Sequence, residues 1–159
     1  MQLTKFTDYS LRVLIYLAHL PEGKALATIA DISRDYEIPA THLMKVVHRL
    51  GQRGYIVTVR GKGGGMRLAK PPELINVGEL IRDTEDNIDL VECFSSTKQD
   101  CPLLPACALK NVLLEARKSF LATLDFYSLS DIMGLKTPVR SHAVHLIAAP
   151  VSRKKKAAA

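Results

Sequence analysis

Long apolar runs are absent from this sequence of 159 residues. No run approaches the roughly 18 consecutive apolar residues that a membrane-spanning helix requires, and the first ten residues lack the basic and then apolar pattern of a secretory signal. We therefore expect a cytoplasmic protein with no membrane partner. Cysteine is scarce too: the chain has three, and an odd number in a reducing compartment argues against a framework of disulfides.

Acidic residues are missing from one segment altogether. Residues 40–70 contain seven basic residues and no acidic residue, whereas residues 73–101 contain eight acidic residues and only two basic ones. Four of the charges behind the net charge of +6 lie in the last seven residues, so this local contrast is more informative than the total. A basic surface suits phosphate, and the acidic surface beside it would repel phosphate.

The first third of the chain predicts three short helices. Thr7 can cap a helix over residues 8–20. Thr28 can cap a second helix from Ile29 to Tyr36, and a third follows from about Ala40 to Gly51. Apolar residues recur at helical spacing in each of them. The second and third helices are joined by a turn of three or four residues, which is typical of a helix–turn–helix.

Two β-rich runs follow, Tyr55–Val59 and Met66–Ala69, and a glycine-rich turn with basic residues separates them. Such a hairpin is typical of the wing in a winged helix–turn–helix. A fourth helix is expected from Val77 to about Thr84, with Asn76 as its cap. The predicted fold class is therefore mainly α: a winged helix–turn–helix of three helices plus a two-stranded wing, followed by a long C-terminal dimerisation helix.

That long helix is expected from about Ala108 to Phe126. Its side chains form a seam at alternating steps of four and three, which predicts contact with a partner helix; the alternative is an amphipathic helix packed on its own domain. The seam consists of Leu109, Leu113, Ala116, Phe120, Thr123 and Tyr127. The chain then divides into a DNA-binding domain (1–85), a cysteine-rich loop (86–107), the dimerisation helix with a contact segment (108–135) and a tail expected to be disordered (136–159).

The third helix and the hairpin carry the residues expected to contact DNA. Thr41 and His42 would point into the major groove from the start of the helix, and Lys45 and Arg49 lie one turn apart on its exposed face. The full set is Thr28, Thr41, His42, Lys45, His48, Arg49, Arg60, Lys62, Gly63 and Arg67. A solvated basic face is the alternative, but a segment free of acidic residues with this element pattern favours DNA.

The three cysteines lie close together in the sequence, as Cys93, Cys101 and Cys107, in a stretch with neither helical nor strand periodicity. Thiolates are soft ligands that suit iron–sulfur clusters, zinc or copper(I). Three of them leave one ligand position open, with Glu92 and Asp100 as the nearby oxygen donors. The spacing leaves three alternatives open: a cluster, a zinc site, or three free thiols.

Four stretches of this sequence resemble the IscR/NsrR-type family of iron–sulfur winged-helix regulators, and the resemblance runs from Met1 to about Met133. These stretches are MQLTKFTDYSLRVLIYLAHLPEG, VRGKGGGMRLAKP, ECFSSTKQDCPLLPACALK and SFLATLDFYSLSDIM. The resemblance implies a homodimer with an iron–sulfur cluster on Cys93, Cys101 and Cys107. It also implies that Asp8 of the partner protomer serves as a fourth ligand, and it favours a 4Fe–4S cluster over a 2Fe–2S cluster.

The resemblance further implies a function within the nitric-oxide-sensing branch of that family: a repressor that binds double-stranded DNA at an inverted-repeat operator and releases it when the cluster is nitrosylated. Two features depart from the family pattern. Seven residues separate the first two cysteines, which is a long spacing, and Ala108-Leu109-Lys110 stands where IscR-type proteins have a histidine ligand.

Three other functions are weighed against this one. The first is a regulator of the IscR type that senses redox state or iron–sulfur status. The second is a zinc-stabilised nucleic-acid-binding module. The third is an enzyme with a cysteine nucleophile and a histidine base, but no readable pattern pairs a histidine with a cysteine and a third orienting group. We therefore expect that the chain is not an enzyme.

Overall fold

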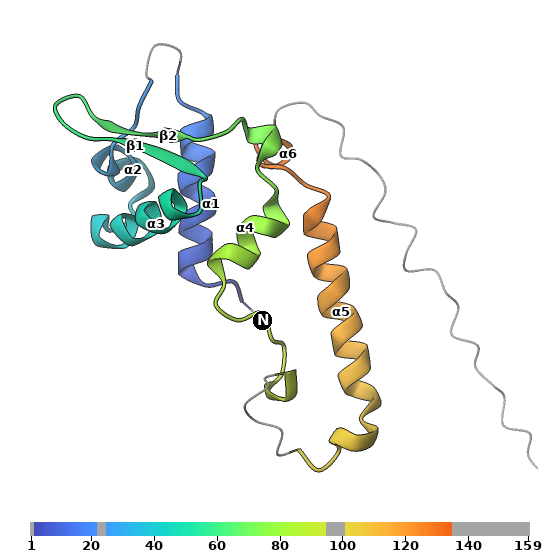
Figure 1. The fold of residues 1–159 in the computed structure, drawn as a ribbon. Helices are drawn as coiled ribbons and strands as arrows, with labels where there is room; N and C mark the ends of the chain where they lie inside the picture. The colour runs from blue at the N-terminus through green and yellow to red at the C-terminus, as the bar shows by residue number, and fades with distance from the viewer. Residues whose placement is uncertain (1, 22–24, 95–100, 135–159) are drawn as a thin grey trace, which may run out of the picture.

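The computed structural model describes residues 2–21, 25–94 and 101–134, so the predicted tail over residues 136–159 lies outside the described part of the chain. Figure 1 shows a head made of the first helices and a hairpin, with one long helix beside it. The elements are α1 (Lys5–Ala18), α2 (Ile29–Tyr36), α3 (Ala40–Gln52), β1 (Ile56–Val59), β2 (Gly65–Leu68), η1 (Pro72–Leu74), α4 (Val77–Thr84), η2 (Glu92–Phe94), η3 (Leu104–Ala106), α5 (Ala108–Asp125) and α6 (Leu129–Ile132).

Helix α1 begins earlier than predicted, which corrects the role given to Thr7. The N-cap is Thr4, whose side chain accepts a hydrogen bond from the backbone N–H of Thr7. Thr7 itself is fully buried inside the first turn. Both threonines can cap a helix, and Thr7 lost that role because its hydroxyl bonds to a residue of α4 instead. The helix also ends at Ala18, two residues before the predicted end.

Helices α2 and α3 form the predicted helix–turn–helix. Thr28 caps α2 in a capping box with Asp31, and the turn passes through Glu37, whose φ of 55° lies in the left-handed region. Helix α3 extends to Gln52, one residue beyond the predicted end. The apolar residues that recur at helical spacing along α3 are all buried: Leu43, Val46, Val47 and Leu50.

The predicted hairpin is also present, with β1 antiparallel to β2 in the register Ile56↔Leu68 and Val59↔Gly65. Strand β2 of the hairpin is tied to the residue before the N-cap of α2, because Ala27 and Met66 exchange two backbone hydrogen bonds. A Cβ atom on Gly65 would lie 2.6 Å from the carbonyl oxygen of Ala27, so this close approach requires glycine. The wing is therefore fixed to the helical head through β2.

One apolar core joins α1, α2, α3, the hairpin and the residues that follow α5. Helix α6 was not predicted; Ser128 caps it in a capping box with Asp131. It places Leu129 in the core, fully buried, and the Leu129 N–H donates to the carbonyl of Ile75 at 2.8 Å. The chain thus returns to the head after α5. These elements confirm the mainly α, winged helix–turn–helix fold class.

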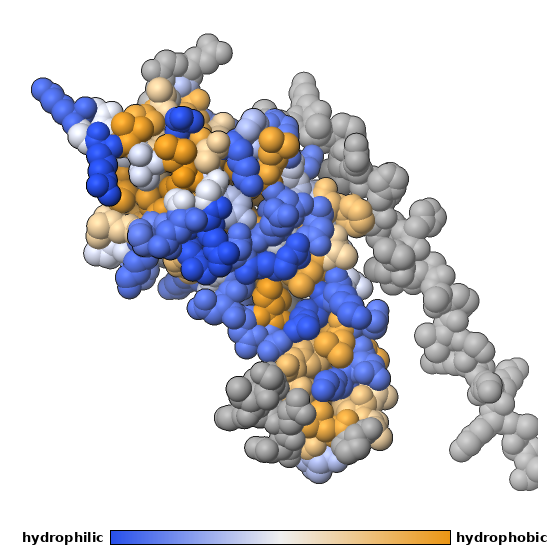
Figure 2. Space-filling view, in the orientation of Figure 1, coloured by the Kyte–Doolittle hydropathy of each residue, from blue (hydrophilic) through white to orange (hydrophobic). Residues whose placement is uncertain are grey.

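Helix α5 runs as an arm beside α4, and none of its residues is buried within the protomer. The residues of the predicted seam differ in burial. Leu113, Phe120 and Tyr127 are half-buried, whereas the other three are exposed. A second row, at steps of three and four, is exposed throughout: Leu109, Val112, Ala116, Ser119, Thr123 and Phe126. Figure 2 shows apolar surface along this arm. No helix in the described ranges is both long and apolar enough to span a membrane.

Candidate nucleic-acid interface and cysteine segment

Helix α3 presents the side chains that the sequence assigned to DNA. Thr41, His42, Lys45 and His48 are exposed and Arg49 is half-buried. Thr41, Lys45 and His48 share one side of the helix because they are spaced by four and three residues. The ring of His42 lies 6.1 Å from that of Tyr9 in an edge-to-face arrangement, so His42 also contributes to packing between α1 and α3.

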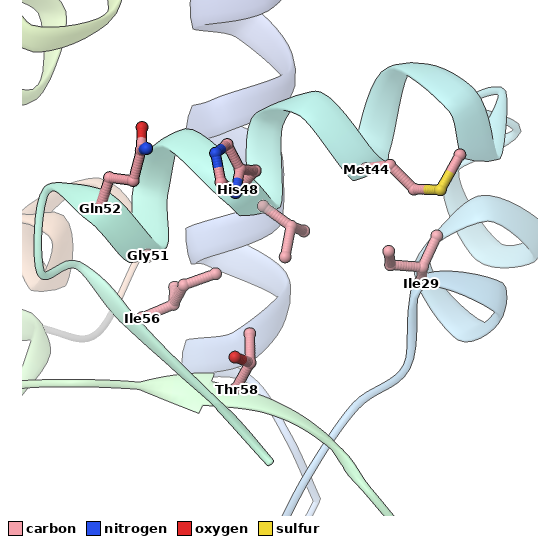
Figure 3. Close-up of a pocket in the computed structure, with 8 residues that line it drawn as sticks. Ile29, Met44, His48, Gly51, Gln52, Ile56 and Thr58 are labelled. Carbon is pink, nitrogen blue, oxygen red and sulfur yellow. The ribbon is translucent and has the colours of Figure 1, made fainter. Parts of the chain in front are cut away.

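A groove of about 490 Å³ separates α3 from β1 (Figure 3). Met44, His48 and Gln52 lie along its α3 side, while Thr58 of β1 and Ile29 of α2 lie opposite. The Met44 side chain is 53% exposed, although it is large and apolar. Sequence reasoning missed Met44 and Gln52. Met44 lies four residues before His48 and Gln52 four residues after it. This helical spacing, which is visible in the sequence, places the three side chains on one face of α3.

The tip of the wing is exposed and basic. Arg60, Lys62, Gly63 and Arg67 all face solvent. Gly63 has a φ of +77°, a left-handed conformation that other residues adopt at a cost, and it lets the tip turn tightly. Arg67 donates one hydrogen bond, to the carbonyl of Leu68 at 3.3 Å.

The basic residues of this face keep their charge unneutralised. Within the described ranges, no ion pair engages Lys45, Arg49, Arg60, Lys62 or Arg67. Thr28, the remaining predicted contact, is exposed, and its hydroxyl accepts from the N–H of Asp31 at 3.1 Å. Cations without acidic partners attract an anionic polymer, because phosphates can replace their counterions.

Three consecutive residues at the end of α4 form a joint between α4 and the head, just before the cysteine-rich segment. They are Asp83, Thr84 and Glu85. Thr84 accepts a hydrogen bond from the hydroxyl of Thr7 at 3.0 Å, in a buried setting. The Glu85 carboxylate accepts from the N–H of Thr4 at 2.7 Å and from its hydroxyl at 3.1 Å. Both contacts join α4 to the first turn of α1, which itself packs against α3.

Asp83 completes this joint between α4 and the head. Its carboxylate pairs with Arg53 at 3.2 Å, immediately after α3, and accepts a hydrogen bond from the Tyr55 hydroxyl at 2.8 Å, immediately before β1. Burial, and then the hydrogen bond to Asp83, raise the pKa of Tyr55 above its ordinary value. Tyr55 therefore stays neutral and keeps donating to Asp83 across the physiological pH range.

The three cysteines are free thiols with different surroundings. Cys93 lies in η2 and is half-buried, and Cys101 is exposed. Cys107 is half-buried at the N-cap of α5, where its side chain makes no capping hydrogen bond. Among residues 2–21, 25–94 and 101–134, no three His, Cys, Asp or Glu side chains gather closely enough to hold a metal ion. The convergence expected from the sequence is therefore not observed.

By donor chemistry the cysteines nevertheless fit a soft metal centre. All three thiols are free of disulfides, and Cys107 has no competing role as a cap. Of the oxygen donors, Glu92 is exposed in η2, and Asp100 lies outside the described residues. Asp8 is in α1, where it pairs with Arg12 at 3.0 Å and does not join the cysteines within the protomer.

Comparison with known proteins identifies the family. Residues 3–134 match the model of the Rrf2 family, described as iron-dependent transcriptional regulators. The HTH-type transcriptional regulator NsrR of Bacillus licheniformis is 53% identical over 133 residues, which covers 84% of this chain and 92% of that protein. The NsrR regulator of Bacillus subtilis is 51% identical over 139 residues, covering 87% and 94%.

A solved structure supports the same assignment at the level of the fold. IscR of T. potens superposes with a TM-score of 0.64 at 26% identity, covering 84% of this chain and 86% of that one. The relatives are regulators of transcription, which confirms that the chain is not an enzyme. The chain belongs to the Rrf2 family of DNA-binding transcriptional regulators and, within that family, groups with the NsrR regulators.

Proposed function

We propose that the chain is a cytoplasmic, homodimeric repressor that senses nitric oxide through an iron–sulfur cluster and then releases its operator. The observation that carries the DNA-binding half is that one continuous segment, residues 40–70, forms both α3 and the wing. Its cations on α3 and the wing tip have no acidic partner within the described ranges. The iron-dependent description of the family supports the sensor half.

On DNA, the two parts of this face have different tasks. Thr41, Lys45 and His48 would face base edges in the major groove, because they share the exposed side of α3. Arg60 and Lys62 would contact phosphates from the wing tip, and the backbone of the tip would also approach the phosphates. Base contacts supply specificity, and phosphate contacts supply salt-dependent affinity.

A second copy of the chain is the proposed occupant of the exposed row on α5, from Leu109 to Phe126. Leu109, Val112 and Phe126 are each more than 60% exposed, and the row follows the spacing of a helix–helix seam. Pairing through α5 would bury this surface and leave both α3 helices free. Two α3 helices about one DNA turn apart, roughly 34 Å, would read an inverted repeat.

Cys93, Cys101 and Cys107 would hold the cluster, with a 4Fe–4S type favoured over a 2Fe–2S type. Asp8 of the partner protomer is the proposed fourth ligand, in line with its half-exposed carboxylate on α1. When bound, the cluster would supply thiolate-held iron that reacts with nitric oxide. The chain's own residues would carry the response: Asp83, Thr84 and Glu85 link the cysteine-bearing segment to α1, α3 and the wing.

The experiment compares wild-type protein with Cys101→Ala, purified without oxygen. Duplex DNA selected from a random inverted-repeat library serves as the probe, and fluorescence anisotropy reports binding. We expect coloured, iron-containing wild-type protein that binds the duplex and releases it on addition of nitric oxide, and a colourless variant that does not bind. A Cys101→Ala protein that still binds and still responds to nitric oxide contradicts the proposal. Zinc in place of iron and sulfide supports the zinc-stabilised module instead.

A further inference from the structure

We propose that Arg117 of α5 is a positioning residue for Cys93, and that it fixes this thiol relative to Cys107 on the same helix. The proposal rests on the proposed function of the three cysteines as ligands. It assigns a role to a residue that has no part in the DNA interface and lies outside the exposed row of α5.

Two contacts of the Arg117 guanidinium bracket Cys93 in the sequence. Its Nη1 atom lies 2.6 Å from Oδ1 of Asp89, four residues before Cys93. Its central carbon lies 5.0 Å from the centroid of the Phe94 ring, one residue after Cys93. The side chains of Arg117 and Asp89 are 29% and 22% exposed, so solvent screens this ion pair less than the exposed pairs elsewhere on the surface.

Few hydrogen bonds hold the segment in place. Residues 87–91 form no regular helix or strand, and η2 is a single turn. Among the hydrogen bonds between described residues, the pair Arg117–Asp89 is the only one that connects residues 87–94 to another element. A segment with so few hydrogen bonds to other elements samples other positions more readily when one of them is removed.

The attachment of the Cys93 segment to Arg117 also sets its position relative to Cys107, because α5 connects Arg117 to Cys107. Cys107 occupies the N-cap position of α5, and Arg117 lies ten residues further along the same rigid helix, about 15 Å away at 1.5 Å per residue. Arginine suits this task because its planar guanidinium can bond a carboxylate with one edge while a ring stacks on its face. Lysine could keep the ion pair with Asp89 but would lose the planar contact with Phe94.

The neighbouring cation provides a matched control. Lys118 lies on the same helix, is 71% exposed, and pairs only loosely with Glu115 at 3.6 Å. Lys118→Met removes the same charge from α5 as Arg117→Met, and it leaves the Cys93 segment untouched. Any effect of overall charge on the chemistry of the thiols will therefore appear in both variants.

The first arm of the test uses the full-length, metal-free protein and no cofactor. Iodoacetamide modifies the thiols, and peptide mass spectrometry follows each cysteine separately. In Arg117→Met we expect the alkylation rate of Cys93 to rise about fivefold, with Arg117→Lys between that variant and wild type. Cys101 and Cys107 should keep their wild-type rates. A Cys93 rate equal to that of wild type overturns the proposal, and so does an equal rise at all three cysteines, which would report unfolding.

The second arm loads each protein with iron and sulfide without oxygen and measures iron loss to a chelator. We expect Arg117→Met to lose iron at least about fivefold faster than wild type, and Lys118→Met to match wild type. Equal rates in Arg117→Met and wild type would overturn the role toward the cluster. A wild-type protein that takes up no iron refutes the proposed function instead, and the alkylation arm still decides whether Arg117 positions Cys93.

Discussion

The hydrogen bond between Thr7 and Thr84 offers a quantitative test of the joint between α4 and the head. Thr7 is 0% exposed and Thr84 is 7% exposed, so solvent water cannot replace the partner of either hydroxyl. The Thr7 hydroxyl donates to Thr84 at 3.0 Å, and the Thr84 hydroxyl donates onward to the carbonyl of Leu80 at 2.8 Å. Valine has nearly the shape of threonine, so each replacement removes a hydroxyl and leaves no large cavity.

The expected changes in the free energy of unfolding depend on which buried hydroxyl loses its hydrogen-bond partner. Thr7→Val leaves the Thr84 oxygen buried without its donor, and this should lower the free energy of unfolding by about 1–3 kcal/mol. Thr84→Val should cost less, toward about 1 kcal/mol, because the Thr7 hydroxyl still lies 3.3 Å from that of Thr4. The double variant leaves neither partner unpaired. Its cost should fall below the sum of the single costs by about 1 kcal/mol.

Urea unfolding of the four proteins at one protein concentration measures these differences. Thr58→Val is the matched control, because Thr58 lies exposed on β1 and its hydroxyl bonds to no other described residue; it should change the free energy by less than about 0.5 kcal/mol. Additive costs in the double variant would refute the reasoning, since they would show that the two hydroxyls act independently.

Three further predictions concern the wing tip, strand β2 and one tyrosine. Lys62→Ala should weaken binding to all DNA sequences alike and lower the salt slope by about one, and a changed sequence preference would contradict its phosphate role. Gly65→Ala should lower the free energy of unfolding by about 1–3 kcal/mol, because the new Cβ would lie 2.6 Å from a backbone carbonyl oxygen; Gly51→Ala, with nothing within 4 Å, should not be destabilising. The hydrogen bond that Tyr16 donates to Asp35 raises the pKa of Tyr16 to about 12. Its contribution to stability is therefore complete below the ordinary pKa of about 10 and disappears as the pH rises through about 12, so the difference in unfolding free energy between wild type and Tyr16→Phe should shrink over that range; a constant difference would contradict it.

The sequence predicted helices well where local chemistry decides their ends. Helices α2 and α4 have the expected bounds because Thr28 and Asn76 each cap a first turn with a suitably placed N–H group. At α1, however, the sequence predicted Thr7 as the cap, whereas the cap is Thr4. A contact with Thr84, 77 residues away in the chain, decided between them, and local sequence carries no information about it.

The candidate site could be predicted only in part, for related reasons. The exposed cations of α3 and the wing followed from helical spacing and from the absence of acidic residues. Met44 was missed because an apolar residue on a helix is expected to face the core, yet this one is 53% exposed beside the groove. The joint made by Asp83 could not be predicted either, since its partners Arg53 and Tyr55 are brought to it by tertiary packing.

Titration with nitric oxide tests the central claim most directly. Protein purified without oxygen and bound to a fluorescent inverted-repeat duplex is titrated while visible absorbance and anisotropy are recorded in the same cuvette. The account predicts that the absorbance of the bound cluster and the bound fraction of DNA fall together, over the same range of nitric oxide per protomer. Iron-free protein that binds the duplex as tightly as the iron-loaded protein, or DNA release with no change in absorbance, would contradict it.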